Sequence, residues 1–144
     1  MSNIQCEIRY NTLSKEQIVS HYEENGISLP NQSLEEYARK LKANAELIEL
    51  WHSGKLVGLC ACYMNNFDSK VAYIAHIAIL GTYRGEGLGE SLISQVEHKA
   101  KSKGFDYMQL EVNKDNTAAY RFYQKKGYVL KEDRGGKLLM YKAL

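Results

Sequence analysis

Three glycines lie within the seven residues from Arg84 to Glu90, between an apolar run at 71–80 and a stretch at 88–103 whose apolar residues have helical spacing. These patterns predict a buried strand followed by a helix, so the glycines occupy a strand-to-helix turn. Glycine lets backbone N–H groups approach a ligand, because no side chain intervenes. The first N–H groups of a helix lack internal partners and carry partial positive charge. The turn therefore favours an anion such as a phosphate or pyrophosphate.

The order of residues in this turn narrows the class of phosphate ligand. No Gly-Lys-Ser/Thr follows, so the turn is not a P-loop. The third glycine comes one position too early for the dinucleotide fingerprint. Arg84, Gly87 and Gly89 do fit Arg-x-x-Gly-x-Gly. This pattern resembles the pyrophosphate loop of the GCN5-related N-acetyltransferases (the GNAT family), which hold acetyl-coenzyme A.

A second stretch, 116–128, resembles a later motif of the same family, Asn-x-x-Ala-x-x-x-Tyr-x-x-x-Gly-Phe/Tyr. The matching residues are Asn116, Ala119, Tyr123, Gly127 and Tyr128. The two motifs occur in the order that the family has. The resemblance covers 71–128 well and the first forty or so residues hardly at all.

Periodicity predicts a mixed α/β fold with the order β-α-α-β-β-β-α-β-α-β-β. The expected strands are 4–10, 45–52, 55–65, 71–80, 105–113, 128–132 and 137–141. The expected helices follow Ser14, Ser33, the glycine turn and Asn116, with capping boxes at Ser14 and Ser33. We expect one domain, 1–144. The resemblance implies a GNAT-type splayed mixed sheet flanked by helices, with the pantetheine arm of the cofactor in the gap.

The resemblance also implies which residues hold acetyl-CoA. Backbone N–H groups of 85–90 would bind the pyrophosphate, Arg84 would fix the loop or add charge, and the main chain of 77–79 would pair with pantetheine. With the second motif, the expected cofactor residues are Ile77, Ala78, Ile79, Arg84, Gly85, Glu86, Gly87, Leu88, Gly89, Glu90, Asn116, Ala119 and Tyr123. No metal is expected.

For catalysis, the resemblance implies that Tyr123 protonates the departing sulfur, as a phenol can. The base is open between two residues. His76 adjoins Ala75, which replaces a glutamate that many members carry. In a regular strand His76 would face the other way, but members of the family often bulge this strand, which would turn it back. Glu111, twelve residues before Tyr123, resembles the base of the ribosomal-protein N-terminal acetyltransferases. Each of these side chains also has a purely structural interpretation, in the core or on the solvated surface.

The expected function is therefore acetyl-CoA-dependent transfer of an acetyl group to a primary amine of a small molecule or a peptide. A first alternative is a CoA-binding regulatory module without turnover, which Ala75 allows. A second is a nicotinamide dinucleotide-binding oxidoreductase, because Glu111 lies roughly twenty residues past the glycines, as that fingerprint asks.

The charge balance and the apolar runs limit which partners and which location the sequence favours. The net charge is +2, from 19 basic and 17 acidic residues, which gives no reason to expect binding to nucleic acid or to an anionic membrane. The sequence shows no apolar run of bilayer length and no signal peptide at its start, so a cytoplasmic location is expected. The resemblance adds a possible homodimer.

Overall fold

The computed structural model of the chain describes residues 4–144, which form seven strands, four α-helices and one 3₁₀ turn. The strands are β1 (Glu7–Tyr10), β2 (Glu46–His52), β3 (Lys55–Tyr63), β4 (Val71–Ile79), β5 (Tyr107–Asn113), β6 (Val129–Asp133) and β7 (Lys137–Ala143). The helices are α1 (Lys15–Glu24), α2 (Leu34–Asn44), α3 (Leu88–Ser102) and α4 (Thr117–Lys125), with the 3₁₀ turn η1 at Gly81–Tyr83. This confirms the predicted order and adds η1.

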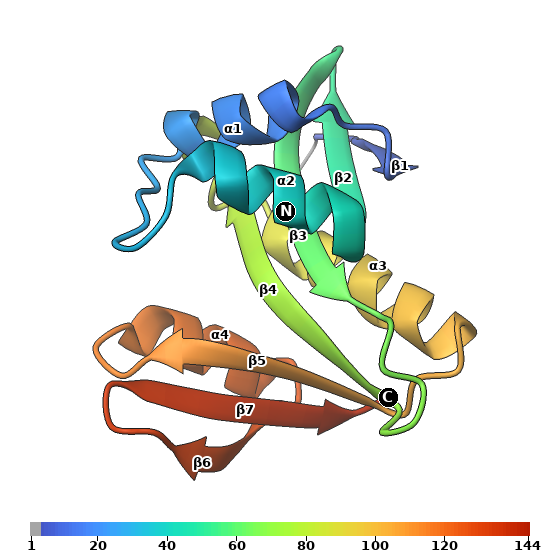
Figure 1. Cartoon of the computed structure of the whole chain (residues 1–144), viewed down its shortest axis with the longest axis vertical. Helices are drawn as coiled ribbons and strands as arrows, with labels where there is room; N and C mark the ends of the chain where they lie inside the picture. The colour runs from blue at the N-terminus through green and yellow to red at the C-terminus, as the bar shows by residue number, and fades with distance from the viewer. Residues whose placement is uncertain (1–3) are drawn as a thin grey trace.

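The strands form one sheet in the order β1-β2-β3-β4-β5-β7-β6. Within the described residues, β4 and β5 are the one parallel pair, and their ladder runs for four residue pairs, from Val71↔Tyr107 to Ile74↔Leu110. Beyond Ile74, β4 stays paired with β3 while β5 stays paired with β7. The sheet therefore opens between the two strands, and Figure 1 shows them diverging from their meeting point near the C-terminus.

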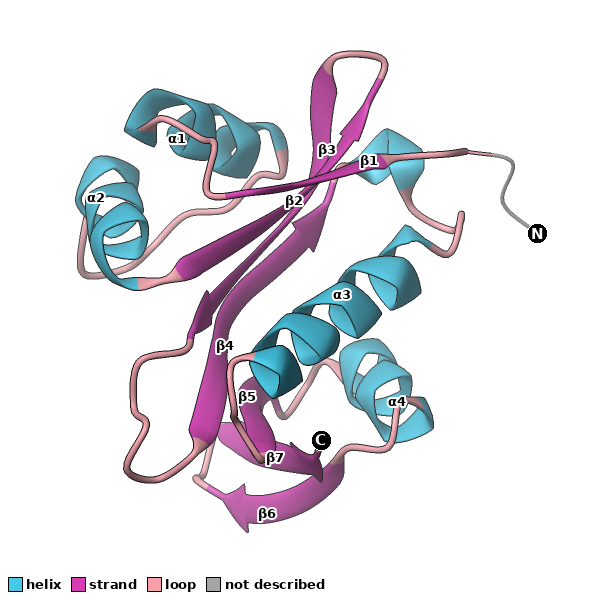
Figure 2. Ribbon diagram, turned by 90° about the vertical axis from the view of Figure 1, so that its right-hand side faces the viewer, coloured by secondary structure: helices cyan, strands magenta, loops and turns pink. Residues whose placement is uncertain are grey.

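Helices cover both faces of the sheet and divide the core in two. Helices α1 and α2 pack on one face, around Ile18, Tyr22 and Leu41. Helix α3 packs on the other face, through Leu92, Ile93 and other buried residues, and the α4 residue Tyr123 joins that cluster. Figure 2 shows the sheet between these two layers, with α4 beside the opened half. The gap in the sheet is thus flanked by helices on both sides.

Three helices end in the same way, on a glycine in the left-handed conformation. Gly26, Gly104 and Gly127 have φ values of 69°, 94° and 96°. At each one, the next residue donates its N–H five residues back, as Phe105 does to Ala100 and Tyr128 to Tyr123, both at 3.0 Å. This is the Schellman motif, which satisfies the last helical carbonyls. It explains the Gly-Tyr end of the second sequence motif: Gly127 takes the strained position and Tyr128 is buried.

Several expected boundaries were wrong for identifiable reasons. Strand β1 starts at Glu7, not at residue 4, because its partner β2 turns away after His52. Strand β5 starts at Tyr107, because Phe105 is used to close α3. The capping box at Ser14 forms in full. At Ser33, the described residues show one of the two bonds of a capping box, in which the Glu36 N–H donates to the Ser33 side chain.

Candidate active site

Two adjoining cavities, of about 370 and 600 Å³, follow the opened edge of β4. They share Ile79, Arg84 and Phe122, so together they form one groove that runs from the glycine turn into the gap in the sheet. The first is lined by Ile79, Tyr83, Arg84, Gly85, Gly87, Leu88, Gly89, Glu90 and Phe122. The second is lined by Asn25, Ile27, His76, Ile77, Ala78, Ile79, Arg84, Ala118, Ala119 and Phe122.

The glycine turn presents its main chain to one end of this groove. Gly85 and Gly87 have φ values of 82° and 77°, which only glycine adopts without strain, and Gly87 is the N-cap of α3. The first intrahelical bond at this end runs from Ser91 N–H to Gly87 O. The N–H groups of 88–90 precede it and have no helical partner, so they are free to bind an anion.

Arg84 lies where the two cavities meet, and its side chain is held rather than free. Its Nε donates to the carbonyl of Ile79 at 3.1 Å, and its Nη2 donates to Asn25 Oδ1 at 3.3 Å. The guanidinium therefore both fixes the turn against β4 and adds a positive charge at the anion end of the groove.

The main chain of β4 at 77–79 borders the groove without a partner strand on the β5 side, because the β4–β5 ladder ends at Ile74. On its other side this segment is bonded to β3. A free strand edge can pair with amide groups of an extended ligand. The edge faces the cavity at the point where Ala119 and Phe122 of α4 form the opposite wall.

Tyr123 points into the core from α4 and is 8 % exposed. Its ring packs edge-on against Phe122 and Tyr128, at centroid distances of 5.2 and 5.6 Å. No hydrogen bond engages its hydroxyl within residues 4–144. Burial raises the pKa of Tyr123 well above its ordinary value, so the phenol keeps its proton at neutral pH. Asn116 caps α4, with Oδ1 accepting from Ala119 N–H at 3.1 Å, and lines neither cavity.

A bulge turns His76 toward the α1 and α2 face. Ala61 pairs with His76 but Cys62 pairs with Ile74, so β4 carries one extra residue at Ala75. The His76 ring lies 4.6 Å from the Tyr22 ring, centroid to centroid, and its Nδ1 is buried without a partner. His76 lines the groove, and burial lowers the pKa of its imidazole to about 4.

Glu111 stands on β5 just past the point where β4 separates. Its Oε1 accepts from the Tyr73 hydroxyl at 3.3 Å, and its Oε2 pairs with Arg134 Nη1 at 3.0 Å. Arg134 comes from the turn between β6 and β7, so β4 and this turn together hold the carboxylate. Burial, and then the nearby carboxylate, raises the pKa of Tyr73 to about 12.

The acetyltransferase (GNAT) family model matches residues 11–128 of this sequence. The chain belongs to the GNAT family of acetyltransferases.

Individual GNAT proteins resemble the chain over shorter or more distant matches. An uncharacterized N-acetyltransferase of Methanocaldococcus jannaschii is 34% identical over 96 residues, which are 64% of this chain and 42% of that protein. The [ribosomal protein bS18]-alanine N-acetyltransferase of Haemophilus influenzae is 33% identical over 85 residues, 59% of this chain and 53% of that protein. The chain thus spans about half the length, or less, of these curated relatives.

The fold is that of solved GNAT structures. The structure of the PaiA N-acetyltransferase of Thermoplasma acidophilum in complex with coenzyme A matches with a TM-score of 0.74 and 18% identity, over 96% of this chain and 99% of that one. The splayed mixed sheet inferred from the two motifs is therefore confirmed. The dinucleotide-binding alternative was wrong, because a doubly wound sheet needs several parallel strand pairs and the described sheet has one.

Most of the site residues expected from the GNAT motifs line the groove, but some do not. Those that line it are Ile77, Ala78, Ile79, Arg84, Gly85, Gly87, Leu88, Gly89, Glu90, Ala119 and His76. Neither cavity is lined by Glu86, Asn116, Tyr123 or Glu111. Five further groove residues, Asn25, Ile27, Tyr83, Ala118 and Phe122, were missed. Asn25 and Ile27 have the pattern of a helix end and Phe122 that of a core aromatic, whereas Tyr83 and Ala118 directly adjoin the motif residues Arg84 and Ala119.

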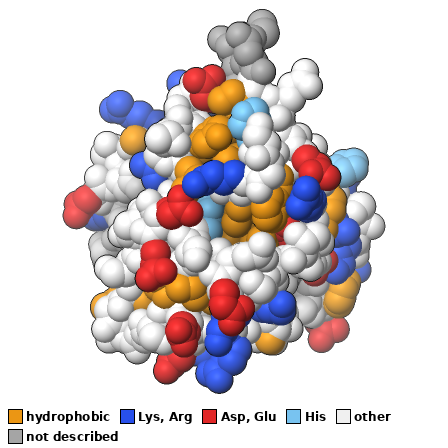
Figure 3. Space-filling view, turned by 90° about the horizontal axis from the view of Figure 1, so that it is seen from above, with side chains coloured by type: hydrophobic (Ala, Val, Ile, Leu, Met, Phe, Trp, Pro, Cys, Tyr) orange, Lys and Arg blue, Asp and Glu red, His pale blue; other side chains and the backbone are white. Residues whose placement is uncertain are grey.

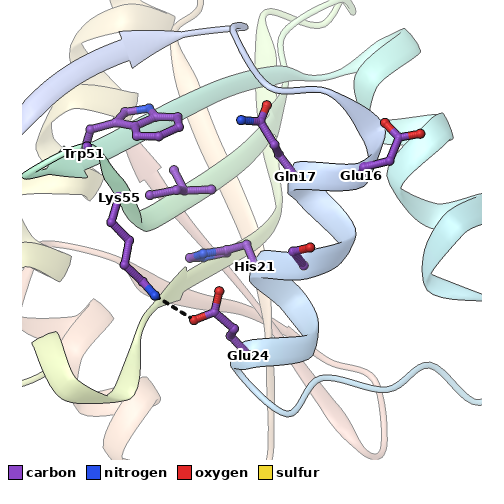
Figure 4. Close-up of a pocket in the computed structure, with 9 residues that line it drawn as sticks. Glu16, Gln17, His21, Glu24, Trp51 and Lys55 are labelled. Carbon is purple, nitrogen blue, oxygen red and sulfur yellow. Dashed lines mark hydrogen bonds and ion pairs between the residues drawn. The ribbon is translucent and has the colours of Figure 1, made fainter.

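A separate pocket of about 340 Å³ lies between α1 and the β2–β3 hairpin, and it shares no lining residue with the groove. Figure 4 shows Gln17, His21 and Glu24 on α1, facing Trp51 and Lys55 of the hairpin. The face that carries α1 and the hairpin is seen in Figure 3, where apolar side chains near its centre are bordered by acidic and basic ones. Helix α1 borders both, because His21 lines this pocket and Asn25, at the end of the helix, lines the groove.

None of the helices in the described part of the chain has the length and apolar character that crossing a bilayer requires. Residues 4–144 also bring together no group of three or more His, Cys, Asp or Glu side chains that would suit a metal ion. Among the described residues, the groove therefore provides backbone N–H groups for an anion and isolated polar side chains.

The buried imidazole of His76 predicts a loss of stability in acid. Its folded-state pKa is about 4, against an ordinary value of 6.5. Between these values the unfolded chain binds the extra proton, so the free energy of unfolding falls as pH falls from 6.5 toward 4. The slope for this one group approaches about 1.4 kcal/mol per pH unit. His76→Phe, which keeps an aromatic ring against Tyr22, is expected to flatten this part of the profile.

Urea unfolding of wild type and His76→Phe at half-unit pH steps from 7.5 to 4.5 measures the two slopes. At pH 7.5 the imidazole is neutral in both states, so the difference there reports packing alone and serves as the reference. Parallel profiles for the two proteins would contradict the prediction. Buried His21, whose pKa burial also lowers, adds its own acid sensitivity to both proteins.

Proposed function

We propose that this chain is an acetyl-CoA-dependent N-acetyltransferase. The observation that carries the proposal is the continuous groove from the N-terminus of α3 to the opened edge of β4. One end offers backbone N–H groups for a pyrophosphate, and the other offers a free strand edge for pantetheine amides. Membership of the GNAT family and a CoA-bound structure of the same fold support this use of the groove.

In this proposal the cofactor lies with its pyrophosphate against 85–90 and Arg84, and its pantetheine against 77–79. Asn116 acts indirectly by capping α4, which holds Ala119 and Tyr123 in place. Acetyl-CoA is a cosubstrate, and no metal takes part in the proposed reaction. The positioning of amine against thioester supplies much of the rate.

The proposed reaction is direct attack of a primary amine on the thioester carbonyl. The new C–N bond forms as the C–S bond breaks, the amine gives a proton to a base, and the sulfur of CoA receives one from an acid. Tyr123 is the proposed acid, because its phenol is protonated at neutral pH and its hydroxyl is not engaged elsewhere among residues 4–144. An acid or base in such a role contributes on the order of 10²- to 10⁴-fold.

Of the two base candidates we favour Glu111. The His76 ring is packed against Tyr22, 4.6 Å between centroids, and its Nδ1 is buried, so the imidazole is held in the core packing. Glu111 stands where the sheet parts, and the Haemophilus bS18-alanine acetyltransferase is a relative of the chain. Ala75, at the position of the usual glutamate, leaves Glu111 as the carboxylate nearest the gap on these two strands.

The acceptor is proposed to be a primary amine of a small molecule or a peptide. The Haemophilus relative supports an N-terminal amine of a protein as one member of this class. We further propose a single catalytic domain over 1–144, a cytoplasmic location, a homodimer, and no role for nucleic acid or membrane. The near balance of 19 basic and 17 acidic residues supports the last point.

Gly87→Glu is expected to weaken binding of CoA by about a hundredfold or more. The change strains a position at φ 77° and places a carboxylate beside the pyrophosphate site. Gly104→Glu is the matched control, because it creates the same strain at φ 94° beyond the other end of α3 and away from the groove. Isothermal titration with CoA measures both variants, with thermal unfolding to check folding. Equal CoA affinity in the two variants would refute the loop assignment.

Tyr123→Phe is expected to lower kcat by about 10²- to 10⁴-fold, because it removes the proton donor and keeps the ring in its packing site. The dissociation constant for CoA should change less than twofold. Release of CoA thiol, followed over a panel of amines, measures turnover. Full turnover in the variant would remove Tyr123 from the mechanism. If wild type binds CoA but turns over no amine, the regulatory-module alternative gains support.

Glu111→Gln is expected to lower kcat by about 10²-fold or more, whereas His76→Phe should cost less than tenfold. The amide of glutamine keeps the shape of the side chain and can still contact Tyr73 and Arg134, but it accepts no proton. The same thiol-release assay, run across pH on folded protein, compares the two variants. The reverse order of effects would assign the base to His76.

A further inference from the structure

Asn25, the residue that closes α1, is bonded to the arginine of the glycine turn. The Arg84 Nη2 donates to Asn25 Oδ1 at 3.3 Å, across 59 residues of sequence. We propose that Asn25 is a positioning residue for acetyl-CoA, which holds the Arg84 guanidinium at the phosphate end of the groove. The inference rests on the proposed function, because it takes the groove to be the CoA site.

The hydrogen bonds of Asn25 fix which way its amide points. Its Nδ2 donates to the carbonyl of His21 at 2.9 Å. A carbonyl can only accept, so the NH₂ group must face His21 and the oxygen must turn toward Arg84. The backbone N–H of Asn25 is also bonded to the carbonyl of His21, at 3.2 Å. Both main chain and side chain therefore hold Asn25 on the last turn of α1.

The end of α1 is itself anchored to the sheet, so it can act as a fixed point. His21 is 2 % exposed, and its Nε2 lies 3.4 Å from the carbonyl of Ala78 on β4. Glu24 pairs with Lys55 of β3 at 3.1 Å. Figure 4 shows Glu24 of α1 paired with Lys55, and His21 beside them on the same helix. Asn25 is thus fixed in place by α1, which is bonded to β3 and β4, and it lines the groove itself.

The two bonds to Arg84 act on a side chain that would otherwise be mobile. Arg84 is exposed, and ordering such a rotamer-rich side chain when a ligand binds costs about 0.5–1.5 kcal/mol. Bonds at Nε and at Nη2 fix both the position and the rotation of the planar group. Of the five guanidinium N–H donors, these use two and leave three for phosphate oxygens. Because Asn25 holds the Arg84 side chain in place before CoA binds, less conformational entropy of that side chain is lost on binding.

Loss of the Asn25 side chain should weaken CoA through Arg84 alone. Asn25→Ala is expected to raise the dissociation constant for CoA by about three- to tenfold, the range that corresponds to ordering one such side chain. The kcat at saturating acetyl-CoA should stay within twofold. In an Arg84→Ala background, Asn25→Ala should produce no further change, because the side chain that it positions is already absent.

Isothermal titration of CoA into wild type, the two single variants and the double variant tests this coupling. Asn44→Ala is the matched control, because Asn44 ends α2 with the same bond from Nδ2, to Lys40 O at 3.1 Å, and contacts no residue of the groove. An unchanged dissociation constant in Asn25→Ala would overturn the inference. So would an equal loss with and without Arg84, which is the result of a merely structural role. Wild type that binds no CoA would overturn the proposed function together with this inference.

Discussion

The site depends on one constraint, the short parallel ladder between β4 and β5. It joins four residue pairs and then stops, while each strand keeps its other neighbour. The main chain of β4 at 77–79 is therefore left without a neighbouring strand on the β5 side and borders a cavity there. Buried backbone groups need partners. A ligand with amide groups along its length can supply those partners. The opening of the sheet thus turns the edge of β4 into a binding site.

The parts of this arrangement that local rules govern could be predicted from the sequence. Gly85 and Gly87 occupy left-handed positions, and Ser14 and Asn116 cap their helices, as their residue types indicate. Such features depend on neighbours within four or five residues, so the order of elements followed from them. The boundaries that failed, at β1 and β5, are those that pairing or packing with distant residues decides.

The details of the site could not be predicted, because they arise from contacts between distant segments. The family resemblance raised a bulge in this strand, but its place at Ala75 depends on the register of β4 against β3, and this register decides that His76 faces Tyr22. The bond from Arg84 to Asn25 joins a residue of the glycine turn to the residue that ends α1, and no local sequence pattern indicates that these two meet. The depressed pKa of His76 likewise follows from burial between layers, which a sequence pattern does not contain.

The charge around the glycine turn shows why its backbone shape matters so much. Arg84 brings one positive charge, but Glu86 and Glu90 lie in the same seven residues. Glu90 pairs with Lys126 of the segment after α4, at 2.9 Å, which offsets its charge and ties the two helices together. Side-chain charge near the turn therefore adds little net attraction for a pyrophosphate. The attraction must come mainly from the free N–H groups of 88–90 and the dipole of α3, together with the one guanidinium that Asn25 and Ile79 hold in place.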